Sequence, residues 1–276
     1  LTDRFLEAVK AEGVETVDVI GGVANVLALK DATALATIKK AAVYTSQVLR
    51  KHMLPQIEAI VDEEKKVSHA SLADETETVL ADPVRLKLDD KELIEPCYTP
   101  IIMSGGKYDL KPSAASNDEM LHYGTIIVEV GARYKFYCSN VARTYFINPT
   151  NDQKENYMFL TQVFQTVKLA MKHGAKISAA REAAEKLVKA KRPDLESSLT
   201  ANCGFGIGLE FHENQFVITT KNQTKSFVAG TCVVSHASGM CFNLCVGFSG
   251  LKRTTPDNQD KKANDYAILL ADTVMI

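Results

Sequence analysis

Residues Thr125–Ile147 read TIIVEVGARYKFYCSNVARTYFI, two β-rich segments joined by a short turn. β-Branched and aromatic residues dominate both segments, which is typical of strands. The turn is expected at Gly131-Ala132, because glycine adopts backbone angles that other residues avoid. Glu129 and Asn140 then lie on neighbouring strands, eleven positions apart in the chain. The stretch predicts an antiparallel strand pair that carries two polar residues.

The first 80 residues show the spacing of apolar residues that is typical of helices. Asp31 is predicted to cap a long helix that Pro55 kinks or divides, because proline lacks a backbone N–H. Ser68 or His69 is predicted to start another helix. Residues 81–95 are polar, with a proline near each end, and are expected to form a loop.

The second part of the chain alternates between strands and helices. A capping box at Thr150 and Gln153 predicts the start of one helix, and Ser178 is predicted to cap a second helix that Pro193 ends. Helices followed by mainly antiparallel strands predict an α+β fold, with one sheet covered by helices on one side. The other β-rich segments are CYTPIIM, FVITT, GTCVVSHA, MCFNLCVGF and YAILLADTVMI.

Composition narrows the classes of function. The 276 residues are 46% hydrophobic and 24% charged, which is enough for a well-buried core. A net charge of −2 argues against strong direct binding to DNA phosphates. No apolar run approaches the roughly 18 residues of a membrane span, so no membrane association is expected. The six cysteines form no C-x-x-C pair and are expected to be reduced, buried thiols.

A second motif, Cys203–Glu213, reads CGFGIGLEFHE. Its glycines let the backbone approach other atoms closely, and His212 is a candidate metal ligand or base. Phe205, at the centre of the loop, has no ligand atom. A phosphate site is disfavoured because the loop leads into a strand instead of a helix N-terminus.

Two kinds of chemistry remain open on these residues alone. Glu129 and Asn140 are candidates for one side of a cation site, although a neutral amide is a weak ligand. The alternative is that both are ordinary polar residues of a strand pair. A thiol nucleophile activated by histidine is a further alternative, with four candidates: Cys203, Cys245, His212 and His236.

The order of the motifs resembles the pita-bread lobe of the creatinase, aminopeptidase P and methionine aminopeptidase superfamily. The matching segments are VEVGARYKFYCSNVARTYFI, CGFGIGLEFHE, GMCFNLCVGF and ADTVMI, and the resemblance extends over nearly the whole chain. It implies an α+β pita-bread fold, a curved, mainly antiparallel sheet covered by helices. It further implies that residues 1–276 form a single lobe, without the smaller lobe that precedes it in the family. Because the chain opens LTDRFLEAVK, without Met, it is expected to be a fragment of a longer protein.

Active members of that superfamily hold two metal ions with two aspartates, a histidine and two glutamates. The resemblance places the aspartates at Glu129 and Asn140, the histidine at Phe205, and the glutamates at Cys245 and Ala271. A two-metal hydrolase needs several anionic ligands to offset about four positive charges. The resemblance therefore implies degenerate metal-ligand positions, no metal or other cofactor, and no catalytic residues.

A narrower resemblance is to the N-terminal, aminopeptidase-like domain of the large subunit of the histone chaperone FACT. It is carried by CYTPIIMSGGKYDLKPSAASND, GARYKFYCSNVARTYFINP, ENYMFL, CGFGIGLEF and VGFSGL. It implies a non-catalytic nuclear module that binds histones, chiefly the H3–H4 pair, with the other core pair, histones 2A and 2B, as a further candidate. The small HMG-box-type subunit would contact other parts of the full-length protein.

The former substrate cleft is then a candidate peptide site, with His212, Phe205 and Glu129 as possible lining residues. One alternative is a metal-independent hydrolase that uses His212 or His236 as a general base. Another is a structural docking domain with no ligand of its own. The segment VVSHASGMCF departs from the family pattern, and an insertion is expected around Ser235 and His236.

Overall fold

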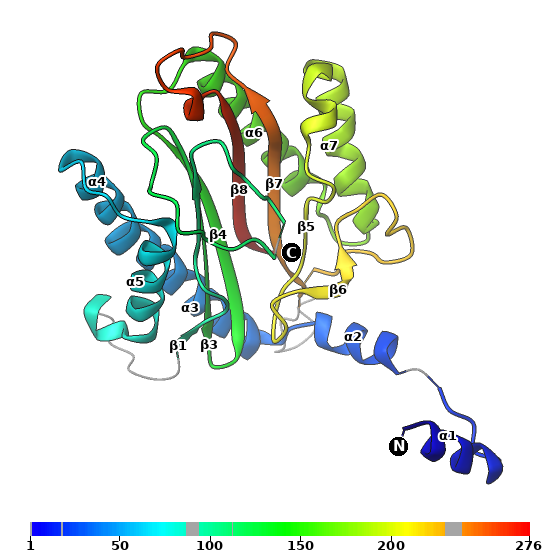
Figure 1. Ribbon diagram of the computed structural model, residues 1–276. Helices are drawn as coiled ribbons and strands as arrows, with labels where there is room; N and C mark the ends of the chain where they lie inside the picture. The colour runs from blue at the N-terminus through cyan, green and yellow to red at the C-terminus, as the bar shows by residue number, and fades with distance from the viewer. Residues whose placement is uncertain (1, 18, 87–93, 112, 230–238) are drawn as a thin grey trace.

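The structure, a computed structural model, describes residues 2–17, 19–86, 94–111, 113–229 and 239–276 (Figure 1). Its α-helices in these ranges are α1 (Thr2–Ala11), α2 (Ile20–Ala28), α3 (Ala32–Val48), α4 (Leu54–Asp62), α5 (His69–Ala81), α6 (Asn151–Ala170) and α7 (Ile177–Lys191). Its strands are β1 (Ile94–Pro96), β2 (Ile101–Ser104), β3 (Thr125–Tyr134), β4 (Tyr137–Phe146), β5 (Gly204–Gly206), β6 (Glu213–Val217), β7 (Cys241–Lys252) and β8 (Asp265–Met275).

These strands form a single sheet in the order β1-β3-β4-β8-β7-β5-β6, with β2 also paired to β3. Every pairing between the strands is antiparallel. Helix α3 packs on β3 and β4, whereas α6 packs on β7 and β8. The two large core clusters lie between the sheet and its helices, one against α6 and α7 and the other mainly against α4 and α5. The predicted α+β architecture with helices on one side of the sheet is therefore confirmed.

The β3–β4 hairpin forms as predicted, but its turn was predicted in the wrong place. The turn lies at Lys135 and Phe136, which have φ values of 45° and 70°, and Gly131 stays inside β3, paired with Asn140. A Cβ at Gly131 would lie 2.5 Å from Cε1 of Tyr98. The glycine therefore makes room for a tyrosine ring and does not turn the chain.

Helix starts that depend on a nearby side chain were predicted correctly. Asp31 accepts a hydrogen bond from the Ala34 N–H at 2.7 Å, and Ser68 accepts one from Ser71. Thr150 forms the predicted capping box. Pro55 lies in the first turn of α4, after a π-helical turn at Leu49–Met53, so that turn divides the long segment.

Ser178 does not cap α7, which begins one residue earlier, at Ile177. The N–H groups of Ile177 and Ser178 donate to the carbonyls of Lys225 and Asn222, at 3.0 and 3.1 Å. A neighbouring loop thus satisfies the free N–H groups of the helix start, which elsewhere need a side-chain cap. The predicted strand GTCVVSHA and the predicted insertion around Ser235 and His236 both lie outside the described residues.

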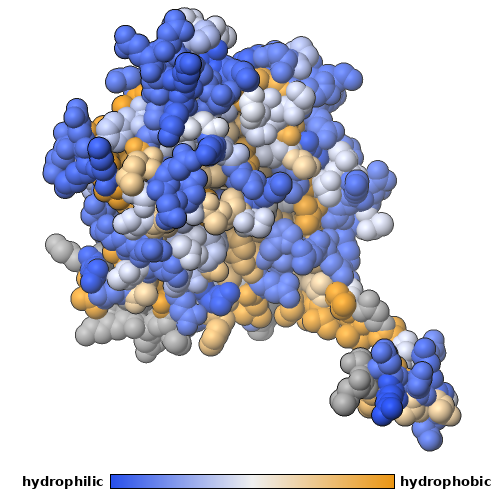
Figure 2. All heavy atoms as spheres, viewed as in Figure 1, coloured by the Kyte–Doolittle hydropathy of each residue, from blue (hydrophilic) through white to orange (hydrophobic). Residues whose placement is uncertain are grey.

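Helix α1 lies away from the sheet, whereas α2 lies beside β6 (Figure 1), and hydrophobic residues gather around α2 (Figure 2). Several of them are more than half exposed: Val17, Val19, Ile20 and Val26. Across the described ranges, every helix is too short or too polar to cross a bilayer.

Candidate functional site

Four neighbouring strands align three of the five predicted degenerate ligand positions in one row. On the β3–β4 pair Glu129 lies opposite Ala142, which in turn lies opposite Ala271 of β8. Ala271 lies opposite Cys245 of β7. Ala142, Ala271 and Cys245 pack with loop residues on the face of the sheet that the helices leave uncovered.

A second row, two residues further along the same strands, holds the other two positions. Asn140 donates its backbone N–H to Oγ1 of Thr273 at 2.8 Å, and Thr273 lies opposite Asn243. Asn243 in turn lies opposite Phe205 of β5. Because side chains two residues apart on a strand share a face, the two rows form one patch. The structure therefore brings together all five residues that the resemblance assigns to ligand positions.

Glu129 and Asn140 form the polar centre of this patch. Oε1 of Glu129 accepts a hydrogen bond from Nδ2 of Asn140 at 2.7 Å. The hydroxyl of Tyr98 donates to Oδ1 of Asn140 at 2.5 Å. Burial raises the pKa of Glu129, and the bond from Asn140 opposes that rise. Sequence reasoning missed Tyr98. The one sequence feature related to it is the distant Gly131, which makes room for its ring.

Phe205 fills the place expected for a histidine ligand and is 3% exposed. Its ring centroid lies 4.0 Å from that of His212 and 5.7 Å from that of Phe211. Phe211 continues the cluster to Tyr98, at 5.0 Å. The Nδ1 atom of His212 lies 2.7 Å from Oδ1 of Asn214, on the outer side of this aromatic cluster.

The thiol–histidine alternative gains no support from this arrangement. In the described ranges, neither Cys203 nor Cys245 hydrogen bonds to a histidine, and His236 lies outside those ranges. Cys203 accepts a bond from Arg181 at 3.6 Å. Burial raises the pKa of both thiols, which keeps them protonated. A thiolate nucleophile is therefore disfavoured at either position.

The glycines of the CGFGIG loop surround a buried ion pair that sequence reasoning missed. Nζ of Lys30 lies 2.5 Å from Oε1 of Glu213, and the two side chains are 2% and 8% exposed. A Cβ at Gly206 would lie 2.5 Å from Oε2 of Glu213, and one at Gly208 would lie 2.5 Å from Cε of Lys30. These glycines make room for the ion pair, which joins the α2–α3 junction to β6.

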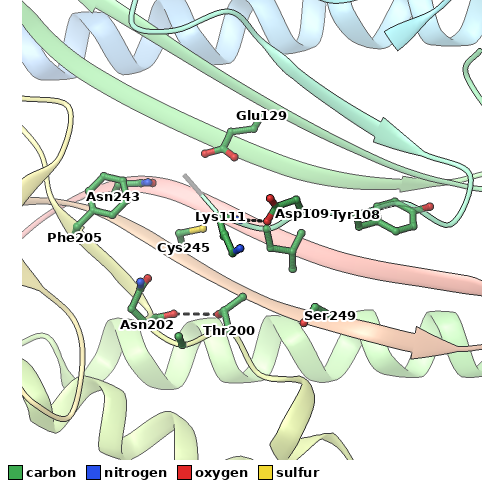
Figure 3. Close-up of a pocket in the computed structure, with 12 residues that line it drawn as sticks. Tyr108, Asp109, Lys111, Glu129, Thr200, Asn202, Phe205, Asn243, Cys245 and Ser249 are labelled. Atoms are coloured by element: carbon green, nitrogen blue, oxygen red, sulfur yellow. Dashed lines mark hydrogen bonds between the residues drawn. The ribbon is translucent and has the colours of Figure 1, made fainter. Parts of the chain in front are cut away.

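A pocket of about 300 Å³ opens over the patch (Figure 3). Glu129, Phe205, Asn243 and Cys245 line its sheet side. Its other walls come from two loops, with these lining residues: Tyr108, Asp109, Leu110, Lys111, Thr200, Ala201 and Asn202. The cleft therefore lies over Glu129, Phe205 and Cys245, three of the five positions that the resemblance assigns to metal ligands.

The side chains at this cleft do not fit a dinuclear metal centre. Glu129 is the one carboxylate at the five former ligand positions, and the others offer an amide, a phenyl ring, a protonated thiol and a methyl group. Among the described residues, no group of three or more His, Cys, Asp or Glu side chains is placed to hold a metal ion. One glutamate cannot balance two divalent ions.

The family model of the metallopeptidases M24 matches residues 36–276. The chain belongs to metallopeptidase family M24. Over its whole length this M24 chain is 37% identical to the FACT complex subunit SPT16 of Zea mays and 38% identical to that of Arabidopsis thaliana. It spans 25% of the length of each of these relatives, which are named as FACT subunits and not as peptidases.

Solved structures agree with this assignment. The N-terminal domain of the FACT complex subunit SPT16 from chickpea matches 99% of the M24 chain with a TM-score of 0.89 and 38% identity, over 62% of that domain. The X-Pro aminopeptidase of Thermotoga maritima matches with a TM-score of 0.72 at 18% identity, over 66% of its chain, which shows the shared fold alone. The predicted pita-bread fold and the resemblance to the FACT domain are confirmed.

The burial of Glu129 predicts a stability that depends on pH. Its folded-state pKa is raised, so its contribution to stability is present at low pH and is lost as pH rises through that pKa. Glu129→Gln should therefore raise the thermal midpoint by about 2 °C at pH 8, and the difference should vanish near pH 4. Calorimetry at both pH values measures this shift.

The exposed residue Glu182 on α7 provides the matched control, because Glu182→Gln removes the same charge from the surface. The control should leave the midpoint unchanged at either pH. A lower midpoint for Glu129→Gln at pH 8 would show that the charged carboxylate stabilises the fold.

Proposed function

We propose that this chain is a non-catalytic peptidase-like module of a FACT-type histone chaperone large subunit, which binds histones while nucleosomes are reorganised. The observation that carries the proposal is an open cleft lined by side chains that do not fit a dinuclear metal centre. The chain's relationship to FACT subunits over its full length supports the same function. The H3–H4 pair is the chief partner, and the pair of histones 2A and 2B is the second.

The cleft suits capture of a peptide without cleavage. Phe205 blocks the former histidine position with a buried ring, and Cys245 is a buried, protonated thiol. Five positions with one carboxylate among them are poorly suited to hold a metal that would lower the pKa of a water molecule and make it a nucleophile. The open pocket beside the sheet still offers Glu129 and neighbouring polar groups to a bound chain.

The assignment implies a nuclear, chromatin-associated protein that acts in transcription, DNA replication and DNA repair. The small HMG-box-type subunit of the complex would bind elsewhere in the full-length protein. The net charge of −2 favours contact with basic histones over contact with DNA phosphates.

Titration of purified H3–H4 against the chain tests the proposal. We expect binding with a Kd of about 10 μM or tighter at moderate salt, measured by calorimetry or fluorescence anisotropy. The pair of histones 2A and 2B is titrated in parallel to rank the two histone pairs. If neither pair binds at that concentration, the chain does not act as a histone-binding module.

An activity screen separates this proposal from the hydrolase alternative. X-Pro peptides and creatine analogues are incubated with the chain, with and without Mn²⁺ or Co²⁺, and no turnover is expected. Turnover that is lost in His212→Ala would identify an enzyme with a histidine base. A docking domain with no histone ligand would instead fail the titration and retain other FACT subunits in a pull-down.

A further inference from the structure

The pocket wall contains a buried hydrogen-bond acceptor that has no partner among the described residues. Asn243 is 1% exposed, and its Oδ1 atom makes no hydrogen bond within the described residues. The residue lies on β7 opposite Phe205 and lines the pocket (Figure 3). Buried acceptors are nearly always satisfied, so an orphaned one in a residue beside a pocket indicates a missing donor.

Glu129 supplies a second acceptor to the same pocket. Oε1 accepts a bond from the neutral amide of Asn140, and no described lysine, arginine or histidine forms an ion pair with the carboxylate. Figure 3 shows the carboxylate directed into the space above Cys245. A buried carboxylate without a counter-charge attracts a cation that can donate hydrogen bonds.

The remaining walls are suited to an aliphatic stem. The phenyl ring of Phe205, the thiol of Cys245 and the side chains of Tyr108 and Leu110 provide apolar surface beside the two acceptors. Lysine and arginine bury such stems while their charged ends make polar contacts. A volume of about 300 Å³ is at the lower end for ligand pockets, which fits one side chain better than a longer ligand.

The charges at the mouth of the pocket offset one another. Asp109 and Lys111 both line it and are of opposite sign, so Glu129 is the charge that is not balanced within the pocket. We propose that this pocket binds the cationic side chain of a lysine or arginine from a peptide partner, with Glu129 and Asn243 as the acceptors. The inference rests on the proposed function, because histone tails are rich in these residues.

Three blocked pentapeptides, Gly-Ser-X-Ser-Gly with X as lysine, arginine or norleucine, test the pocket directly. Acetylation and amidation leave the central side chain as the one source of charge. NMR titration of the side-chain amide of Asn243 should show binding of the lysine or arginine peptide and none of the norleucine peptide. The stronger of the two cationic peptides identifies the preferred group. Equal shifts with norleucine would overturn the proposal.

Variants locate the binding. Glu129→Gln preserves the acceptor for Asn140, and Asn243→Leu has a similar volume without the amide, so both are expected to fold. Each should weaken binding of the cationic peptide by about tenfold, followed through resonances of the pocket walls. The matched control Glu182→Gln, on the outer face of α7, should bind like the parent chain. Unchanged affinity in both pocket variants would refute the assignment.

Parallel titration with H3–H4 keeps this inference distinct from the proposed function. If H3–H4 binds all variants equally and no cationic peptide binds in the pocket, the pocket assignment is wrong and the proposed histone-binding function still holds. If cationic peptides bind at Asn243 but no histone binds the chain, the pocket assignment is supported and the proposed function is refuted.

Discussion

Gly204→Ala is expected to destabilise the protein by more than about 4 kcal/mol, or to prevent folding. A Cβ at this position would lie 1.9 Å from the carbonyl oxygen of Asn243 and 2.9 Å from the N atom of Cys245. Both atoms belong to the backbone of β7, so neither can move without breaking the β5–β7 pairing. The backbone at Gly204 also has φ of +116°, which side chains disfavour. Denaturant unfolding and soluble yield measure the loss.

Gly250→Ala separates the backbone strain from the steric overlap. Gly250 has φ of +68°, and no atom lies within 4 Å of a Cβ placed there. Its substitution should cost about 1–2 kcal/mol, the ordinary penalty for a left-handed residue. Similar losses in the two variants would show that the close approach of Gly204 to β7 does not decide the fold.

Lys30→Met is expected to destabilise the protein by about 3–5 kcal/mol at neutral pH, because it leaves Glu213 charged, buried and unpaired. Burial raises the pKa of Glu213, and Lys30 lowers it. Without Lys30 the pKa rises further, so acid protonates the carboxyl more readily and relieves the cost. The deficit against the parent chain should therefore shrink as pH falls. Denaturant unfolding across this pH range measures it.

Two further variants control for this result. In the double variant Lys30→Met with Glu213→Leu, much of the stability should return, since an apolar pair of similar size often replaces a buried ion pair without loss. Lys65→Met removes an exposed pairing with Glu63 and should cost less than about 1 kcal/mol. A double variant as unstable as Lys30→Met alone would mean that packing, and not the unpaired charge, causes the loss.

The fold and the chemistry of the cleft depend on different residues. The sheet face is built by backbone register and by glycines such as Gly204, and neither depends on which side chains project from that face. Glu129, Cys245 and Ala271 project from that register, which does not depend on the chemistry of their side chains. The fold shared with peptidases is therefore compatible with a pocket that does not fit a dinuclear metal centre.

The sequence alone determined the features that depend on residues close together in the chain, such as helix starts. Asp31 and Thr150 cap helices through bonds that reach two or three residues, so their motifs identify helix starts. The β3–β4 pair follows from strand patterning. These features are local because each depends on hydrogen bonds or side-chain spacing within a few residues of the chain. The assignment of Glu129, Asn140, Phe205, Cys245 and Ala271 to ligand positions stays a prediction of the resemblance.

The tertiary structure decided what depends on contacts between distant segments. Tyr98 approaches Gly131, and Lys30 pairs with Glu213 across 183 positions of sequence. Ser178 is not a cap because a loop more than 40 residues further along supplies the carbonyls instead. The sequence gives no sign of the role of Asn243. Its Oδ1 atom is known to lack a hydrogen-bond partner among the described residues only once the chain is folded. Only folding brings such groups together, because burial and pairing are properties of the packed chain.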